Sequence, residues 1–179
     1  MVTAVAEAAR TDRALAVLDG VMDPEVPVLS VRDLGIVREV AAGDDGSVDV
    51  VLTPTYSGCP ATEVIATAVK GALEAAGFAP VRVATRLAPA WTTDWISAAG
   101  RERLRAYGIV PPGPVDPRAG TPVRFMPRPG SAFATRETLA CPRCDSTNTE
   151  RISAFGSTAC KALWRCRACG EPFEHFKPL

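Results

Sequence analysis

The chain has 179 residues, a length typical of one domain with or without a small appendage. Hydrophobic residues make up 47% of it, and 20 Lys and Arg residues balance 20 Asp and Glu residues. The zero net charge disfavours a nucleic-acid partner, since phosphate contacts supply most of that affinity. No apolar run is long enough to span a bilayer, and Glu7, Arg10 and Asp12 interrupt any secretory signal. We therefore expect a cytoplasmic protein with no membrane partner.

The amino-terminal third predicts one helix followed by two short strands. Apolar positions indicate a helix over residues 4–19, broken near Arg10–Asp12. The prolines of "VMDPEVPVLS" then exclude regular helix. Strands are expected over Ile36–Val40 and through "SVDVVLTPT", with the turn "AAGDDGS" between them.

The clearest helix pattern covers residues 61–76, where apolar residues form one stripe. Pro60 suits the first helical position, and Gly77 suits the stop. The alternating pattern of "PVRVATRL" predicts a further strand, so this region should form a βαβ unit. Another helix is expected at about 93–106.

Composition divides the chain into three parts. Residues 1–110 should form an α/β domain, and residues 111–140 are rich in proline and glycine, as linkers are. Residues 141–179 hold five of the six cysteines. The expected fold class is α+β, a small α/β sandwich followed by a cysteine-rich ribbon.

Four tail cysteines form two CxxC pairs separated by 21 residues: Cys141, Cys144, Cys166 and Cys169. Two such turns can complete a tetrahedral sulfur site, and a 39-residue segment needs a bound ion for much of its folding energy. Zinc suits four thiolates, although rubredoxin-like iron or a cluster fits the same ligands. Two disulfides are the alternative that a reducing cytosol disfavours.

Two further residues of the tail fall outside this spacing. Cys160 is interpreted as a small buried packing residue, with a spare thiol or a second metal ligand as alternatives. His175 is the chain's single histidine, and its neighbours Phe173 and Phe176 favour a packing role over a metal role.

The remaining cysteine, Cys59, stands alone between a strand and a helix, after Thr53 and Thr55 in "TPTYSGCPATEV". Ligand sites in open α/β sheets favour that location. The start of a helix tends to lower a thiol's pKa and makes it a better nucleophile or soft-metal ligand. A buried structural cysteine is the alternative.

Asp23 and Glu25 lie in the proline-rich loop "DPEVP". One interpretation is a helix cap and a solvated acid. The other is a pair of carboxylates brought beside Cys59.

These motifs resemble a known family. "DPEVPVLSVRDLGIV" and "TPTYSGCPATEVI" are similar to the MIP18-type domain, also called the iron–sulfur assembly or DUF59 domain, over roughly residues 12–110. With "PAWTTDWISAAGRERLRAYGIVPP" and "FGSTACKALWRCRACGEPFEHFK", nearly the whole chain resembles the D-subunit family of phenylacetyl-CoA 1,2-epoxidase. The resemblance implies a non-catalytic accessory protein of phenylacetate degradation that matures metal centres. It also implies a di-iron oxygenase and an iron–sulfur reductase as partners, and leaves a homodimer open.

The resemblance marks one functional site and one metal site. The first comprises Asp23, Glu25, Thr53, Thr55 and Cys59, with a transient iron ion or iron–sulfur cluster. The second is a structural zinc held by the four CxxC cysteines. The alternative function is a rubredoxin-like electron-transfer component of the same oxygenase system.

Overall fold

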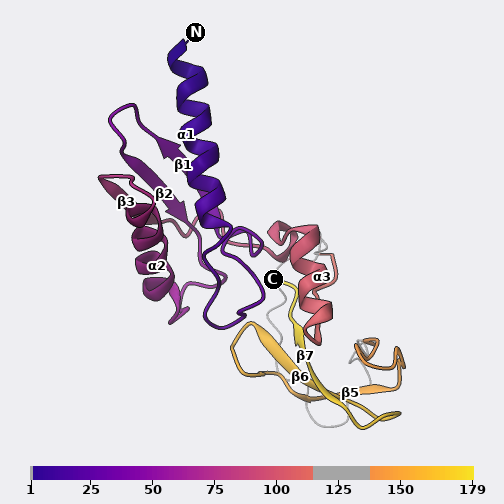
Figure 1. Ribbon diagram of the computed structural model, residues 1–179. Helices are drawn as coiled ribbons and strands as arrows, with labels where there is room; N and C mark the ends of the chain where they lie inside the picture. The colour runs from indigo at the N-terminus through magenta and orange to yellow at the C-terminus, as the bar shows by residue number, and fades with distance from the viewer. Residues whose placement is uncertain (1, 115–137) are drawn as a thin grey trace. The chain divides into compact units, whose positions relative to one another are not determined.

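The computed structural model describes residues 2–114 and 138–179 (Figure 1). These residues form two compact units, Met1–Tyr107 and Gly108–Leu179. The division lies three residues before the boundary that the sequence indicates at residue 110. Most of the expected linker over 111–140 lies outside the described residues.

The first unit is built on a three-stranded sheet in the order β1-β2-β3: β1 (Val37–Ala42), β2 (Val48–Leu52) and β3 (Val81–Thr85). β1 and β2 are antiparallel, and β2 and β3 are parallel. Helix α2 (Thr62–Ala75) connects the parallel pair, so the predicted βαβ unit is confirmed.

The sheet buries one face and exposes the other. The strand predicted through "SVDVVLTPT" is confirmed as β2, where Val48, Val50 and Leu52 are buried and alternate with less buried residues. Helices α1 (Val2–Leu18) and α2 contact the sheet and each other (Figure 1). They supply to the core Ala14, Leu18, Ile65, Val69 and Leu73. On the exposed face, Asp49 pairs with Arg82 at 2.5 Å and Glu39 with Arg86 at 2.6 Å.

Two predicted helix details are wrong. α1 is continuous through Arg10–Asp12, because Thr and Asp inside a helix lower its propensity only modestly. α2 begins at Thr62 rather than at Pro60, and Pro60 lies in the preceding turn.

The helix expected at 93–106 is two elements. A 3-10 turn, η1 (Thr93–Trp95), precedes helix α3 (Ala98–Ala106), with Ser97 as the N-cap. The Ser97 hydroxyl accepts the N–H of Gly100, which satisfies one free donor at the helix start. Buried Trp91, just before η1, donates its indole N–H to the carbonyl of Leu34 at 3.0 Å.

The second unit is a four-stranded sheet in the order β4-β7-β6-β5: β4 (Ile109–Val110), β5 (Thr149–Ser153), β6 (Lys161–Cys166) and β7 (Pro172–Phe176). The sequence predicts strands at "TERISAFG" and "CKALWRC", where the structure has β5 and β6, but it predicts neither β4 nor β7. β4 pairs with β7 in parallel, so Ile109 and Val110 belong to this sheet. Its core holds Cys141, Ala162, Trp164, Cys166 and Phe173.

The fold class is the predicted one, α+β with a small α/β sandwich and a four-cysteine ribbon. Within the described ranges, no helix has the length and apolar character to cross a membrane.

Candidate functional site

Cys59 lies in the loop between β2 and α2, as the sequence indicates. Its N–H donates to the carbonyl of Tyr56 at 3.2 Å. Its own carbonyl accepts the N–H of Thr62 at 3.2 Å and the hydroxyl of Thr62 at 2.9 Å. The backbone is thus fixed on both sides of a half-buried thiol.

Asp23 and Glu25 lie in a closed loop, residues 22–30, here called the acidic loop. A β-bridge between Met22 and Ser30 closes it. Asp23 is only 6% exposed, and its Oδ1 accepts the N–H groups of Glu25 at 2.8 Å and Val26 at 2.7 Å. Asp23 therefore caps a turn, not a helix, and organises the segment that presents Glu25.

The acidic loop and the cysteine loop are electrostatically coupled. Burial raises the pKa of the Cys59 thiol, against the lowering effect of the Ala61 N–H. The negative charge of Glu25, and to a smaller extent that of Asp23, raises the pKa further. The lowered pKa expected from the start of the helix is wrong, because burial and carboxylates outweigh the N–H groups. Free Cys59 is thus a neutral thiol at pH 7.

The two threonines of the predicted site differ in burial. Thr53 is 1% exposed at the end of β2, and its hydroxyl has no hydrogen-bond partner among the described residues. Such buried polar atoms are uncommon and call for an explanation. Thr55 is half-buried in the same loop.

Asp33 is a structural hub that the sequence patterns do not reveal. One of its carboxylate oxygens accepts the N–H of Ser30 at 3.2 Å and the Ser30 hydroxyl at 3.1 Å. The other accepts the Ser97 hydroxyl at 2.9 Å, and Arg103 forms an ion pair with Asp33. Asp33 therefore joins the closing residue of the acidic loop to α3. Ser97, a favoured N-cap residue before a helical pattern, is the sequence signal that could have indicated half of this hub.

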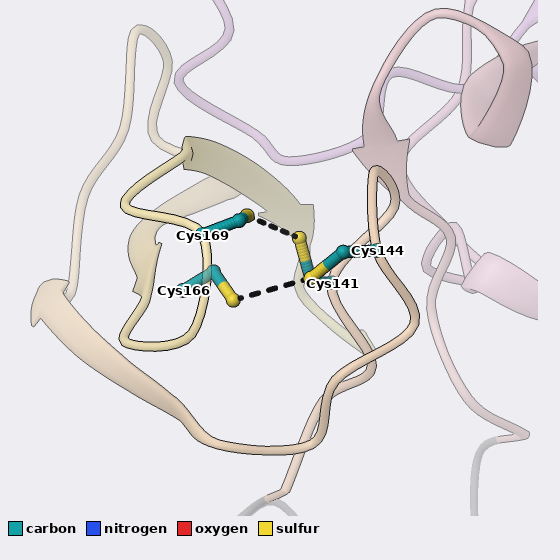
Figure 2. A group of neighbouring side chains, drawn as sticks. All are labelled: Cys141, Cys144, Cys166 and Cys169. Atoms are coloured by element: carbon teal, nitrogen blue, oxygen red, sulfur yellow. Dashed lines mark hydrogen bonds between the residues drawn. The ribbon is translucent and has the colours of Figure 1, made fainter.

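The four tail cysteines converge, as the two CxxC pairs predict (Figure 2). The Sγ atoms of Cys141 and Cys169 are 3.8 Å apart, and those of Cys144 and Cys166 are 3.6 Å apart. All four sulfurs lie within 4.8 Å of one another. A tetrahedral ion with bonds of about 2.3 Å to sulfur requires separations of about 3.8 Å, so the residues fit such a metal. All four are free thiols rather than disulfides.

The two CxxC turns are built alike. The N–H of Asp145 donates to the carbonyl of Cys141 at 2.9 Å, and that of Gly170 donates to the carbonyl of Cys166 at 3.0 Å. Asp145 and Gly170 both have positive φ, 56° and 81°. Glycine adopts this conformation freely and aspartate tolerates it, so each sequence suits its turn.

Grouping four thiols shifts the pKa values of two of them in opposite directions. N–H groups, first that of Cys169, lower the pKa of Cys166 to about 7. The Ser146 N–H lowers the pKa of Cys144, but the neighbouring sulfurs, first that of Cys169, raise it to about 12. The Cys166 thiolate forms readily and disfavours ionisation of Cys144, as like charges do. A bound cation would relieve this repulsion.

Cys160 and His175 do not belong to the four-sulfur cluster. Cys160 is buried, with its Sγ 3.0 Å from the hydroxyl oxygen of Thr158. His175 is 2% exposed and meets Trp164 edge-on, with ring centroids 6.3 Å apart. Both side chains are buried, as the packing interpretation expects.

Two families match this chain. Residues 11–83 match an iron–sulfur cluster assembly protein family, and residues 127–177 match the PaaD zinc beta ribbon domain. Fold and sites thus define an iron–sulfur assembly domain joined to a zinc ribbon.

Similar proteins agree with these two family matches. A protein of Escherichia coli (strain K12), named "Putative 1,2-phenylacetyl-CoA epoxidase" and designated its D subunit, is 49% identical over 90% of this chain and 89% of its own length. The chain belongs to this D-subunit family of 1,2-phenylacetyl-CoA epoxidase. An Fe-S protein maturation auxiliary factor of Bacillus subtilis (strain 168) is 33% identical over 51% of this chain and 89% of its own length.

A solved structure supports the fold of the first unit. It is the crystal structure of a domain of unknown function, DUF59, from Bacillus anthracis, with 26% identity and a TM-score of 0.54. The similarity covers 56% of this chain and 96% of that one.

Proposed function

We propose that the protein is a cytoplasmic accessory factor that helps to assemble iron or an iron–sulfur unit in phenylacetyl-CoA epoxidase. The supporting observation is the coupling of Cys59 to Glu25 inside a domain of the iron–sulfur assembly type. The epoxidase relationship comes from a relative that matches nearly the whole chain. In this proposal the protein is not itself an enzyme, and iron is its cargo.

The proposed cargo site combines one sulfur with carboxylate oxygen. Cys59 is the soft ligand and Glu25 the hard one, a mixed set that suits iron. Asp23 mainly holds the loop, because its Oδ1 already accepts two N–H groups. A thiolate beside two carboxylates is unfavourable without a cation. The site should therefore bind iron with release of the Cys59 proton, and give it up readily when protonated.

Thr53 and Thr55 fall in the same strand-to-helix segment as Cys59. The buried Thr53 hydroxyl, without a partner among the described residues, supports a polar role at this end of β2. We propose that it orders the loop or a water beside the cargo site.

For the ribbon we propose one structural zinc, held by Cys141, Cys144, Cys166 and Cys169. The supporting evidence is the sulfur spacing and the ribbon family. Zinc supplies folding free energy here rather than chemistry. Because the same four sulfurs suit iron, a rubredoxin-like electron carrier is the second candidate. It requires a coloured, iron-containing ribbon, and elemental analysis separates the two.

The proposed partners are the oxygenase component, the reductase component, or both, and the protein could act as a homodimer. The test compares epoxidase purified from cells with and without this protein. We expect less iron per oxygenase or reductase in its absence, and restoration by the wild-type chain. Equal iron content and equal activity in both preparations would refute the proposal.

A further inference from the structure

The loop between β5 and β6 displays an exposed aromatic ring on the ribbon. Phe155 is 64% exposed in this segment, residues 154–160, here called the Phe155 loop. Pairing between β5 and β6 shifts between Arg151 and Ser153, which makes Ile152 the extra residue of a β-bulge. Ile152 is 53% exposed. Two large apolar side chains are thus presented within four residues.

The loop is held in one conformation by Glu174 of β7. One Glu174 oxygen accepts the N–H of Ser157 at 2.5 Å, and the other accepts the Ser157 hydroxyl at 3.2 Å. The N–H of Gly156 donates to the carbonyl of Lys161 at 2.7 Å. A Cβ at Gly156 would lie 2.5 Å from a Glu174 oxygen, so a larger residue there would displace the Glu174 carboxylate from the loop.

This anchoring uses an ion pair between buried Lys161 and half-buried Glu174. Lys161 Nζ lies 2.9 Å from Glu174, and its side chain is 3% exposed. Such pairs add little net stability, because desolvation offsets their attraction. What this pair does provide is a fixed Phe155 loop. A rigid loop that displays an aromatic residue loses little entropy on binding a partner.

The charges around Phe155 favour an acidic partner. Lys177 lies over the Phe155 ring, with its Nζ 4.6 Å from the centroid, and donates to the carbonyl of Ala154 at 3.3 Å. The positive charge of Arg151 acts on the same lysine. The carboxylates of the neighbouring strands are already engaged, Glu174 with Lys161 and Glu150 with Arg165 and Arg167.

We propose that the Phe155 loop is the docking surface by which the ribbon recognises a metal-bearing component of the epoxidase, at an apolar site bordered by carboxylates. This inference rests on the proposed function and gives the two units separate tasks. The ribbon selects the partner, and the Cys59 site handles the cargo. Exposed aromatic residues in rigid surroundings are typical interface hot spots, and flanking charges give specificity.

The test measures binding of the zinc-loaded full chain to the purified oxygenase and reductase components, each immobilised, at about 50 and about 300 mM salt. Phe155→Ala should weaken binding to one component by about tenfold or more. Lys177→Glu should weaken it similarly and remove the salt dependence. The matched control is Leu87→Ala in the first unit, whose side chain is 56% exposed, and its affinity should stay within about twofold of wild type.

Zinc content and thermal unfolding of each variant are measured alongside. If Phe155→Ala loses zinc, Lys177→Glu decides the question. The inference would be overturned by wild-type affinity in Phe155→Ala, or in Lys177→Glu if Phe155→Ala loses zinc. It would also be overturned if the wild-type chain bound neither component. Cys59→Ala should bind normally, so failure of the proposed function would appear as normal epoxidase maturation by Cys59→Ala, with docking unaffected.

Discussion

Ser97 and Asp33 are joined by two hydrogen bonds although 64 residues separate them. The Ser97 hydroxyl donates to a carboxylate oxygen of Asp33 at 2.9 Å, and the Ser97 N–H donates to the Asp33 carbonyl at 2.8 Å. Since Ser97 caps α3 and Asp33 binds Ser30 at the base of the acidic loop, this pair fixes α3 to the loop that presents Glu25.

Asp33→Asn should lower the free energy of unfolding by about 1–3 kcal/mol at neutral pH, because it weakens several hydrogen bonds to a charged acceptor. Burial raises the pKa of Asp33, but hydrogen bonds from Ser97 and Ser30 and the charge of Arg103 outweigh it, so the pKa is lowered. The difference from wild type should therefore be complete above about pH 4 and shrink as the pH falls through the folded-state pKa.

Urea unfolding at a series of pH values measures this effect. Asp44→Asn is the control, because the Asp44 side chain is 68% exposed in its pair with Arg10, and such pairs contribute under about 1 kcal/mol. A constant difference between Asp33→Asn and wild type from pH 7 to about pH 2 would show that the Asp33 charge has no role.

Glu25→Gln should lower the pKa of Cys59, because the carboxylate of Glu25 disfavours the thiolate. Alkylation of Cys59 at pH 8 should then be faster than in wild type, with the midpoint of the pH profile moved to lower pH. The measurement follows the Cys59 peptide by mass spectrometry in zinc-loaded protein, where the ribbon thiols are protected. Glu74→Gln, in the last turn of α2, should leave the profile unchanged. Identical profiles for Glu25→Gln and wild type would separate the acidic loop from the thiol.

Elemental analysis of the purified chain should find about one zinc per molecule, bound to sulfur at about 2.3 Å by X-ray absorption. Iron at that stoichiometry with visible absorption would instead favour the electron carrier. Protein without metal that nevertheless keeps a folded ribbon would contradict both.

Cys144→Ser should remove the metal and unfold the ribbon while the first unit stays folded. The metal supplies much of the folding free energy of so small a segment. Amide hydrogen exchange reports each unit separately, and we expect protection to be lost in β5, β6 and β7 but kept in β2. Cys160→Ser, which changes the buried cysteine outside the cluster, should retain zinc. Joint loss of protection in both units would show that they fold as one.

Local sequence patterns were sufficient to predict those elements whose signal lies within the element itself. The helix after Cys59, the alternation of β2 and the two CxxC turns all have signals within a few residues, and the structure contains them. The two-residue strand β4 has no such signal, since it exists only by pairing with β7. The Asp33 hub depends on residues far apart in sequence for the same reason.

The direction of the Cys59 pKa shift also could not be predicted without the folded structure. Its place before a helix predicts a lowered pKa, and that signal is local. The opposing effects come from burial and from Glu25, which lies 34 residues earlier in the chain. No sequence pattern gives the relative size of these effects.

The most direct test of the central claim is the iron content of epoxidase matured by Cys59→Ala. Cells lacking the native protein would express either this variant, wild type, or Cys160→Ala, which removes the other cysteine outside the zinc cluster. The oxygenase and reductase would be purified and their iron and activity measured. We expect wild-type iron content with Cys160→Ala, and with Cys59→Ala the low iron content found in cells that lack the protein. Full iron content and activity with Cys59→Ala would contradict it and leave Cys59 a structural residue.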